Sequence, residues 1–364
     1  MKFILQMLLA IFIFTGCTTT KYSVQKFNPQ INDSSSYIKN DYIPENKQSD
    51  SLKYNGTSNT ISIVFPSYTI GKYALEATNS INTYLINKGT DFKLNVYDIV
   101  VQNKKNILNV IEQIKKDKVT KVIAMITKED LVHLNEIDGI DQISFYLPLI
   151  NKYDIEDIEK LESLNLTFGA ISYKDQFKKL IEYSNGKPLV EFYGNSGIGR
   201  ALHKYLKNEN ILYQKKIDDN NGRYNVFLEN NSKLDNSAVL LNTPIVKSSI
   251  LLSAINSQEL LISSIMSTQL NYTPLLFSLT QKHDREKLII ANSIGNIPSE
   301  LEEYNKLIGN NLKYSWVNYS TIIGVEYLTK GNIKIFDDLL LKNNQIIFPV
   351  KLYRVGNSSF KLIK

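Results

Sequence analysis

Short apolar runs alternate with amphipathic stretches from Ile61 onward, and this alternation restricts the fold more than any single motif does. Residues 61–65 and 119–126 are rich in aliphatic side chains and bounded by polar turns, as buried strands are. Between such runs, residues 106–116 carry their aliphatic side chains at helical spacing. Because apolar strands separated by amphipathic helices are typical of parallel sheets covered on both faces, the sequence predicts an α/β fold.

The same pattern continues along most of the chain. The further strands that we expect are 92–96, 143–147, 166–171, 188–193 and 211–216. The further helices that we expect are 72–87, one beginning at Lys128, 155–164, 174–184, 199–207 and 245–255. None of these segments has the run of about 20 apolar residues that a membrane-spanning helix needs.

The N-terminus follows a different pattern. Residues 3–14 are apolar except for Gln6 and follow the basic Lys2, which is the composition and length of a signal-peptide core. The run ends in Phe14-Thr15-Gly16-Cys17, which resembles the lipobox of bacterial lipoproteins. The resemblance implies a signal peptide over residues 1–16, diacylglycerol transfer to the Cys17 thiol, cleavage before Cys17 and acylation of the new N-terminus. The alternative is an ordinary secretory peptide with an incidental cysteine.

A polar linker separates this region from the body. Cys17 is the chain's only cysteine, so no disulfide can form within the chain. Residues 17–60 are poor in large aliphatic side chains and cannot bury enough surface to offset their ordering entropy, which predicts a disordered tether. Such a coil has an r.m.s. span of roughly 35 Å. Since Thr18 follows the cysteine, the resemblance implies an extracytoplasmic protein anchored by lipid to the periplasmic face of an outer membrane.

Several segments of the body recur in the order that one protein superfamily shows. They are Ile61-Ser-Ile-Val-Phe-Pro66, Ile70-Gly-Lys-Tyr-Ala74, Phe92-Lys-Leu-Asn-Val-Tyr-Asp98, Tyr193-Gly-Asn-Ser-Gly-Ile-Gly199, Thr321-Ile-Ile-Gly-Val-Glu-Tyr-Leu328, Phe336-Asp-Asp338 and Ile346-Ile-Phe-Pro-Val-Lys-Leu-Tyr353. Together they resemble the type I periplasmic binding proteins, the last three as the closing helix and terminal hairpin. The resemblance implies a two-lobed body over residues 61–364. Lobe 1 is expected over about 61–165 plus a return segment at about 285–345, and lobe 2 over about 166–284 plus the C-terminal end.

Within that superfamily, a lipidated two-lobed body looks most like LppC, the lipoprotein activators of penicillin-binding proteins. LppC proteins carry a helical repeat domain before the body, where this chain has only the linker. Amino-acid-binding relatives have a small Ser/Gly-rich loop after the fourth strand, whose backbone N–H groups hold a carboxylate. Here that position reads Thr127-Lys-Glu-Asp130, while the loop Ser67-Tyr68-Thr69 keeps two hydroxyl groups. The resemblance therefore implies only half of an amino-acid site.

Polar loops that follow expected strands supply the candidates for contact with a ligand or partner, because ligands of such folds bind at the carboxyl ends of strands. The candidates are Ser67, Tyr68, Thr69, Thr127, Asn195, Ser196, Asn242, Thr243, Gln269 and Tyr272. For residues 242–243 and 267–274 the alternative is helix capping. For residues 194–199 it is a purely structural glycine-rich turn, whose N–H groups could otherwise meet an anion.

Motifs for catalysis, metals and nucleic acid are not found. Residues 194–199 match neither the nucleophile elbow, which needs glycine at Ile198, nor the dinucleotide fingerprint, which needs glycine at Leu202. The three histidines lack metal-ligand spacing, and the adjacent carboxylates at 302–303 and 337–338 point in different directions. The net charge is +6, but the lysines form no stripe. We therefore expect no enzyme, no metal, no cofactor and no nucleic-acid partner.

Two functions remain open at this stage. The first is a non-enzymatic envelope lipoprotein that docks to a protein partner, such as a peptidoglycan synthase that it activates. The second is a solute-binding lipoprotein that delivers a small molecule to an ABC transporter. The sequence names neither the partner nor the ligand.

Overall fold

The computed structural model describes residues 59–89, 91–218, 224–258 and 260–363. The chain divides into two units, Met1–Asn55 and Gly56–Lys364, and the fold below is that of the second unit. The expected signal peptide, Cys17 and nearly all of the expected tether lie outside the described residues and stay predictions.

The first lobe is built on a seven-stranded sheet in the order β11-β12-β5-β4-β3-β1-β2. Its strands are β1 (Asn59–Phe65), β2 (Phe92–Asp98), β3 (Lys121–Ala124), β4 (Ser144–Leu147), β5 (Leu166–Phe168), β11 (Leu340–Lys342) and β12 (Gln345–Ile347). All neighbouring strands run parallel except β11, which pairs antiparallel with β12.

Helices cover both faces of this sheet. On one face lie α2 (Ser67–Asn87) and α11 (Trp316–Lys330), with α10 (Ser299–Leu307) against α2. On the other lie α3 (Lys104–Lys116) and α4 (Lys128–Leu134). The expected spacing in α3 is confirmed, since Ile107, Ile111 and Ile114 are all buried against the sheet. The side chain of Asn103 caps α3 by accepting from the backbone N–H of Asn106.

The second lobe has a seven-stranded sheet in the order β14-β13-β10-β9-β8-β6-β7. Its strands are β6 (Leu189–Gly194), β7 (Ile211–Ile217), β8 (Ala238–Asn242), β9 (Ser264–Ser267), β10 (Leu288–Asn292), β13 (Lys351–Val355) and β14 (Phe360–Leu362). Helices α5 (Tyr173–Ser184) and α6 (Gly197–Tyr205) cover one face, and α7 (Asn225–Leu228), α8 (Ile245–Ser257) and α9 (Leu275–Leu279) the other. Strand β13 pairs antiparallel with both β10 and β14, and the other neighbouring strands run parallel.

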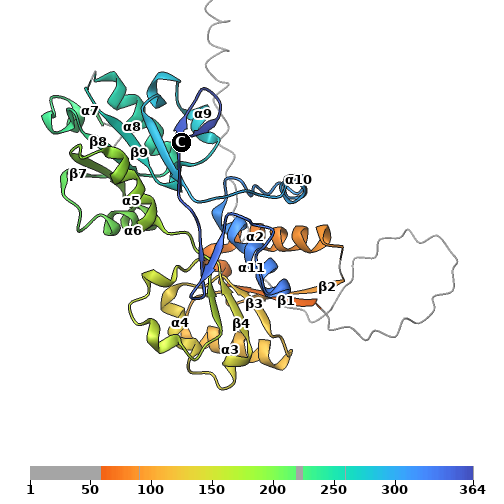
Figure 1. Ribbon diagram of the computed structural model, residues 1–364. Coiled ribbons are helices and arrows are strands. Elements are labelled where there is room, and N and C mark those ends of the chain that lie inside the picture. The colour runs from red at the N-terminus through yellow and green to blue at the C-terminus, as the bar shows by residue number, and fades with distance from the viewer. Residues whose placement is uncertain (1–58, 90, 219–223, 259, 364) are drawn as a thin grey trace, which may run out of the picture. The chain divides into compact units, whose positions relative to one another are not determined.

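The chain passes between the two sheets after β5, after β10, and between β12 and β13 (Figure 1). In the figure the blue C-terminal segments accordingly appear in both lobes. Two mostly parallel sheets, each covered on both faces and joined by such crossings, confirm the predicted two-lobed α/β architecture.

Three details differ from the sequence expectations. Strand β5 pairs with β4 and β10 pairs with β9, so the first lobe's sheet reaches Phe168 and the second lobe's reaches Asn292. The segment 346–353 is not one hairpin, because β12 lies in the first sheet and β13 in the second. The expected helix at 155–164 is wrong. Only a 3-10 turn, Ile158–Leu161, forms there, and no side chain caps it.

Candidate functional site

Ser67, Tyr68 and Thr69 were expected in a loop before a helix at 72–87, but in the structure they already form the start of α2. Its backbone N–H groups already have acceptors. The N–H of Ser67 donates to Asp98 Oδ1 at 3.0 Å, and that of Tyr68 donates to the carbonyl of Val100 at 3.0 Å. The amides that would otherwise meet an anion at a helix start are therefore used inside the lobe.

The donors of Thr127 are also hydrogen-bonded within the lobe. Thr127 precedes α4, and both its N–H and its hydroxyl group donate to Asp130 Oδ2, at 3.1 and 3.0 Å. Gln102 joins the two loops, because its amide nitrogen donates to Thr127 Oγ1 at 3.1 Å and its amide oxygen accepts from Thr69 Oγ1 at 3.4 Å. Asp130 is a buried carboxylate, and the donors of Thr127 satisfy it within the lobe.

In the second lobe, Asn195 and Ser196 form the turn between β6 and α6. Ser196 Oγ caps the helix by accepting from the N–H of Gly199 at 3.2 Å. The carbonyl of Asn195 accepts from the Arg200 guanidinium. These contacts fit the structural alternative for residues 194–199, in which the turn stabilises α6.

The remaining four candidates are buried. Thr243 Oγ1 lies 2.8 Å from Ser248 Oγ, and Asn242 donates to Glu191 Oε1 at 2.8 Å. Gln269 Oε1 accepts from the N–H of Ser293 at 2.9 Å. Tyr272 packs in the core of the second lobe, with its ring centroid 4.3 Å from that of Phe360, and burial raises the pKa of its hydroxyl group. The ten candidates therefore do not converge on one open surface.

One site that sequence reasoning missed is a buried ionisable group in β6. Glu191 is fully buried beneath α6, and its Oε2 lies 2.7 Å from Nδ1 of His203 while its Oε1 accepts from Asn242. The His203 ring stacks on Tyr193 with centroids 3.9 Å apart. A lone glutamate in an apolar strand was the available signal, since a buried carboxylate needs a specific donor.

A second missed site is a pocket of about 550 Å³ between the lobes. It is lined by Lys128, Asp154, Gly197, Arg200, Ala201, Lys204 and Tyr205. The Tyr205 hydroxyl donates to Asp154 Oδ2 at 2.6 Å, which links α6 to the first lobe. Although burial acts to raise the pKa of the nearby Glu129, helix-start hydrogen bonds and the charges of Lys128 and Lys204 lower it overall. The signal was helical spacing, which puts the lining residues of α6 on one face.

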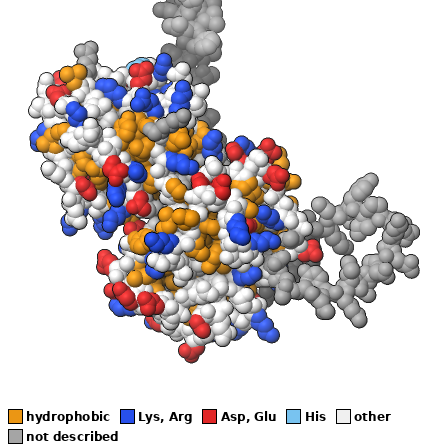
Figure 2. All heavy atoms as spheres, viewed as in Figure 1, with side chains coloured by type: hydrophobic (Ala, Val, Ile, Leu, Met, Phe, Trp, Pro, Cys, Tyr) orange, Lys and Arg blue, Asp and Glu red, His pale blue; other side chains and the backbone are white. Residues whose placement is uncertain are grey.

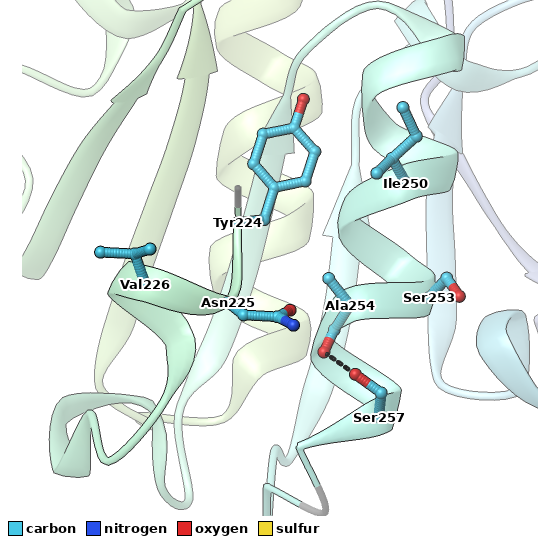
Figure 3. Close-up of a pocket in the computed structure, with 7 residues that line it drawn as sticks. All are labelled: Tyr224, Asn225, Val226, Ile250, Ser253, Ala254 and Ser257. Atoms are coloured by element: carbon cyan, nitrogen blue, oxygen red, sulfur yellow. Dashed lines mark hydrogen bonds between the residues drawn. The ribbon is translucent and has the colours of Figure 1, made fainter. Parts of the chain in front are cut away.

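A further pocket, of about 540 Å³, lies on the outer side of the second lobe between α7 and α8 (Figure 3). Its lining is mainly small and apolar, with Val226 and Ile250 on either side. Across the described ranges, no three potential ligands among His, Cys, Asp and Glu are grouped to hold a metal ion. Within the same ranges, no helix combines the length and apolarity needed to cross a bilayer.

Comparison with known proteins gives likeness in structure alone. No protein-family model matches the chain, and no curated protein matches it in sequence. A solute-binding protein of an ABC transporter from Rhodopseudomonas palustris, solved with p-hydroxybenzoic acid, has a TM-score of 0.60 at 9% identity, covering 84% of this chain and 96% of that one. LivJ of Streptococcus pneumoniae, solved with isoleucine, has a TM-score of 0.57 at 10% identity, covering 84% of this chain and 99% of that one.

The C-domain of LpoA from Haemophilus influenzae, described as a regulator of PBP1A, has a TM-score of 0.56 at 10% identity, covering 84% of this chain and 100% of the domain. In full-length LpoA of that species the match covers 59%. At such identities the likeness establishes the fold. The chain has the type I periplasmic-binding-protein-like fold that solute-binding proteins share with the LpoA C-domain.

Proposed function

We propose that this chain is a non-enzymatic envelope lipoprotein whose body docks to a protein partner, and that the partner is a peptidoglycan synthase that it activates. The observation that carries the proposal is that helix-start donors of both first-lobe loops are hydrogen-bonded within the lobe. The helix-start amides of Ser67 and Tyr68 and both donors of Thr127 are bonded within the lobe. Loops whose helix-start donors are bonded in this way offer little to a carboxylate, but they can still present side chains to a protein.

The structural likeness to the LpoA C-domain supports this choice, because that domain has the same fold and is described as a regulator of PBP1A. The match covers the whole of that domain and 59% of full-length LpoA.

The test uses the chain from Thr18 onward and the class A penicillin-binding proteins of the same cell. We expect saturable binding to one synthase, together with faster glycan polymerisation by that synthase. A solute-binding protein of the same fold is the matched control and should change neither quantity. If no synthase binds and no polymerisation rate changes, the proposal is wrong.

The second candidate function is solute binding, and the pocket between the lobes favours it. Its volume of about 550 Å³ lies in the range of small-molecule sites. A ligand at 100-fold its Kd would add about 2.7 kcal/mol to the free energy of unfolding. Under the docking proposal, amino acids, peptides and sugars leave the unfolding temperature unchanged. A reproducible rise with one of them would favour the transporter role.

Membrane attachment is a separate part of the proposal and rests on the sequence around Cys17. We expect metabolic labelling with a palmitate analogue to modify the wild type and not Cys17→Ser. The Cys17→Ser protein should also leave the membrane fraction. Labelling of the Cys17→Ser protein would refute lipidation at this residue.

A further inference from the structure

The loop after β2 and the start of α2 together expose an apolar surface on the first lobe. Tyr68 is 84% exposed, Val100 54% and Val101 44%, and we call these three residues the Tyr68 patch. The backbone hydrogen bond from the N–H of Tyr68 to the carbonyl of Val100 brings the two segments of the patch together. In the view of Figure 2, hydrophobic side chains gather in the middle of the first lobe, near the place of α2 in Figure 1.

The patch is held in place by hydrogen bonds of its own loop. Asp98 Oδ1 accepts from the N–H of Val100 at 2.7 Å as well as from that of Ser67. The carbonyl of Val101 accepts from the side-chain amide of Asn106 at 2.9 Å, which fastens the loop to α3. A surface ordered before it binds loses less conformational entropy on association.

Val100 adopts a conformation that its side chain disfavours. Its φ is 63°, in the left-handed region, where β-branched residues are rarely found. The other non-glycine residues with positive φ among those described are Lys118 and five asparagines. Burial of the valine does not offset this strain, because half of the side chain faces solvent. Strain kept at an exposed apolar residue indicates a role for that side chain.

Two exposed lysines lie near the loop of the patch. Lys105 lies in the first turn of α3, next to Asn106, whose side-chain amide donates to the carbonyl of Val101. Lys128 follows Thr127, which Gln102 of the same loop contacts. A partner that covers the apolar side chains would thus bring its flanking residues close to positive charge, and acidic residues fit there.

We infer that the Tyr68 patch is the docking surface for a protein segment that presents apolar side chains flanked by acidic ones. The inference rests on the proposed docking function and adds the surface and the chemistry of the partner. Lys128 also lines the pocket between the lobes, so the patch lies beside the mouth of that pocket. A chain segment reaches such a place more readily than a flat bilayer does.

Photocrosslinking in the native cell tests the surface. The full chain carries benzoyl-phenylalanine in place of Tyr68 or Val101, and, as matched controls, in place of Val226 or Val246 on the second lobe, which are also exposed. We expect one adduct from the first pair and none from the second. Mass spectrometry of the adduct should find a segment with apolar and acidic residues. The double substitution Lys105→Glu/Lys128→Glu should lower the adduct yield about tenfold.

The outcomes distinguish an error in the docking surface from an error in the docking function. Adducts only at the second-lobe positions would overturn the Tyr68 patch and leave docking standing, whereas no adduct at any position would count against both. Crosslinking to a segment without acidic residues overturns the partner chemistry. Sedimentation of the unlipidated chain with phosphatidylglycerol vesicles, lost in Tyr68→Ala, would assign the patch to a membrane instead.

Val100→Asn provides a readout that a purely structural role would not give. Asparagine tolerates the left-handed conformation, so the substitution should raise the unfolding temperature while it lowers the adduct yield at position 68. A lower unfolding temperature, or an unchanged yield, would contradict the role of Val100.

Discussion

The buried glutamate of the second lobe allows a quantitative prediction. Glu191 is fully buried and has two donors in the structure, Nδ1 of His203 at 2.7 Å and Nδ2 of Asn242 at 2.8 Å. Removing one partner of a buried carboxylate costs more than an ordinary hydrogen bond, because the charge stays behind without compensation.

The magnitude follows from the burial of each donor. A hydrogen bond to a charged group contributes about 1.5–3 kcal/mol. The side chain of His203 is 32% exposed, so water can replace part of the bond, and His203→Ala should cost about 2 kcal/mol. Asn242 is fully buried and no water replaces it, but its Oδ1 has no partner among the described residues. Asn242→Ala removes that unsatisfied acceptor as well, so its net cost should be about 1 kcal/mol.

A double-mutant cycle with Glu191→Leu isolates the pair. Without the carboxylate, His203→Ala loses little more than the stacking on Tyr193, so the coupling should be about 1–2 kcal/mol. Urea unfolding of the chain from Thr18 onward measures it, followed by circular dichroism and by the fluorescence of the single tryptophan, Trp316, in the first lobe. Coincidence of the two transitions shows whether the lobes unfold together. If His203→Ala costs the same in both backgrounds, the reasoning is refuted.

Three further predictions concern the first lobe and its link to the second. Burial raises the pKa of the Glu326 carboxyl above its value in the unfolded chain. Below about pH 4 the carboxyl is protonated in both states and leaves the free energy of unfolding unchanged. As the pH rises toward the folded pKa, the carboxyl increasingly lowers the free energy of unfolding. Glu326→Gln should therefore increase the free energy of unfolding at pH 7 and not at pH 4, which urea titrations at the two pH values check. A Cβ on Gly324 would overlap the ring of Tyr146, so Gly324→Ala should cost about 1–3 kcal/mol in thermal or urea unfolding, and the cost should disappear in a Tyr146→Ala background. Tyr205→Phe removes the donor to Asp154, and amide hydrogen exchange at Lys152–Asp154 should become faster while that in β8 stays unchanged.

Periodicity was sufficient to predict the α/β class because the relevant signal is local, whereas the two-lobed body was expected from the family resemblance. The isoleucines of α3 face the sheet as their spacing indicates, and the apolar run at 61–65 forms most of β1, with Ile61, Ile63 and Val64 buried. The boundary at β5 was missed because the pairing of this three-residue strand with β4 and β12 places it in the first lobe, and no local pattern shows that pairing. The segment 155–164 has helical spacing but no capping side chain, and it formed only a short turn.

The candidate site was predicted less well, for a different physical reason. A polar residue after a strand can face the cleft or bond within its lobe, and the choice depends on partners distant in sequence. Gln269 accepts from Ser293, 24 residues after it, and Asn242 donates to Glu191, 51 residues before it. Neither partner could be identified from one sequence. Tyr68 was identified by its position, but the strain at Val100 beside it is a backbone property that the sequence does not reveal.

Asp98 connects the two conclusions about the first lobe. Its position at the end of β2 contributed to the family resemblance, yet its role follows only from its contacts. One oxygen, Oδ1, accepts from Ser67 and so removes a helix-start amide from any ligand, and the same oxygen accepts from Val100 and so fixes the loop that exposes the valine. Loss of the free amide and gain of the ordered apolar loop thus arise from one side chain. A first lobe built in this way favours contact with a protein surface over capture of a small carboxylate.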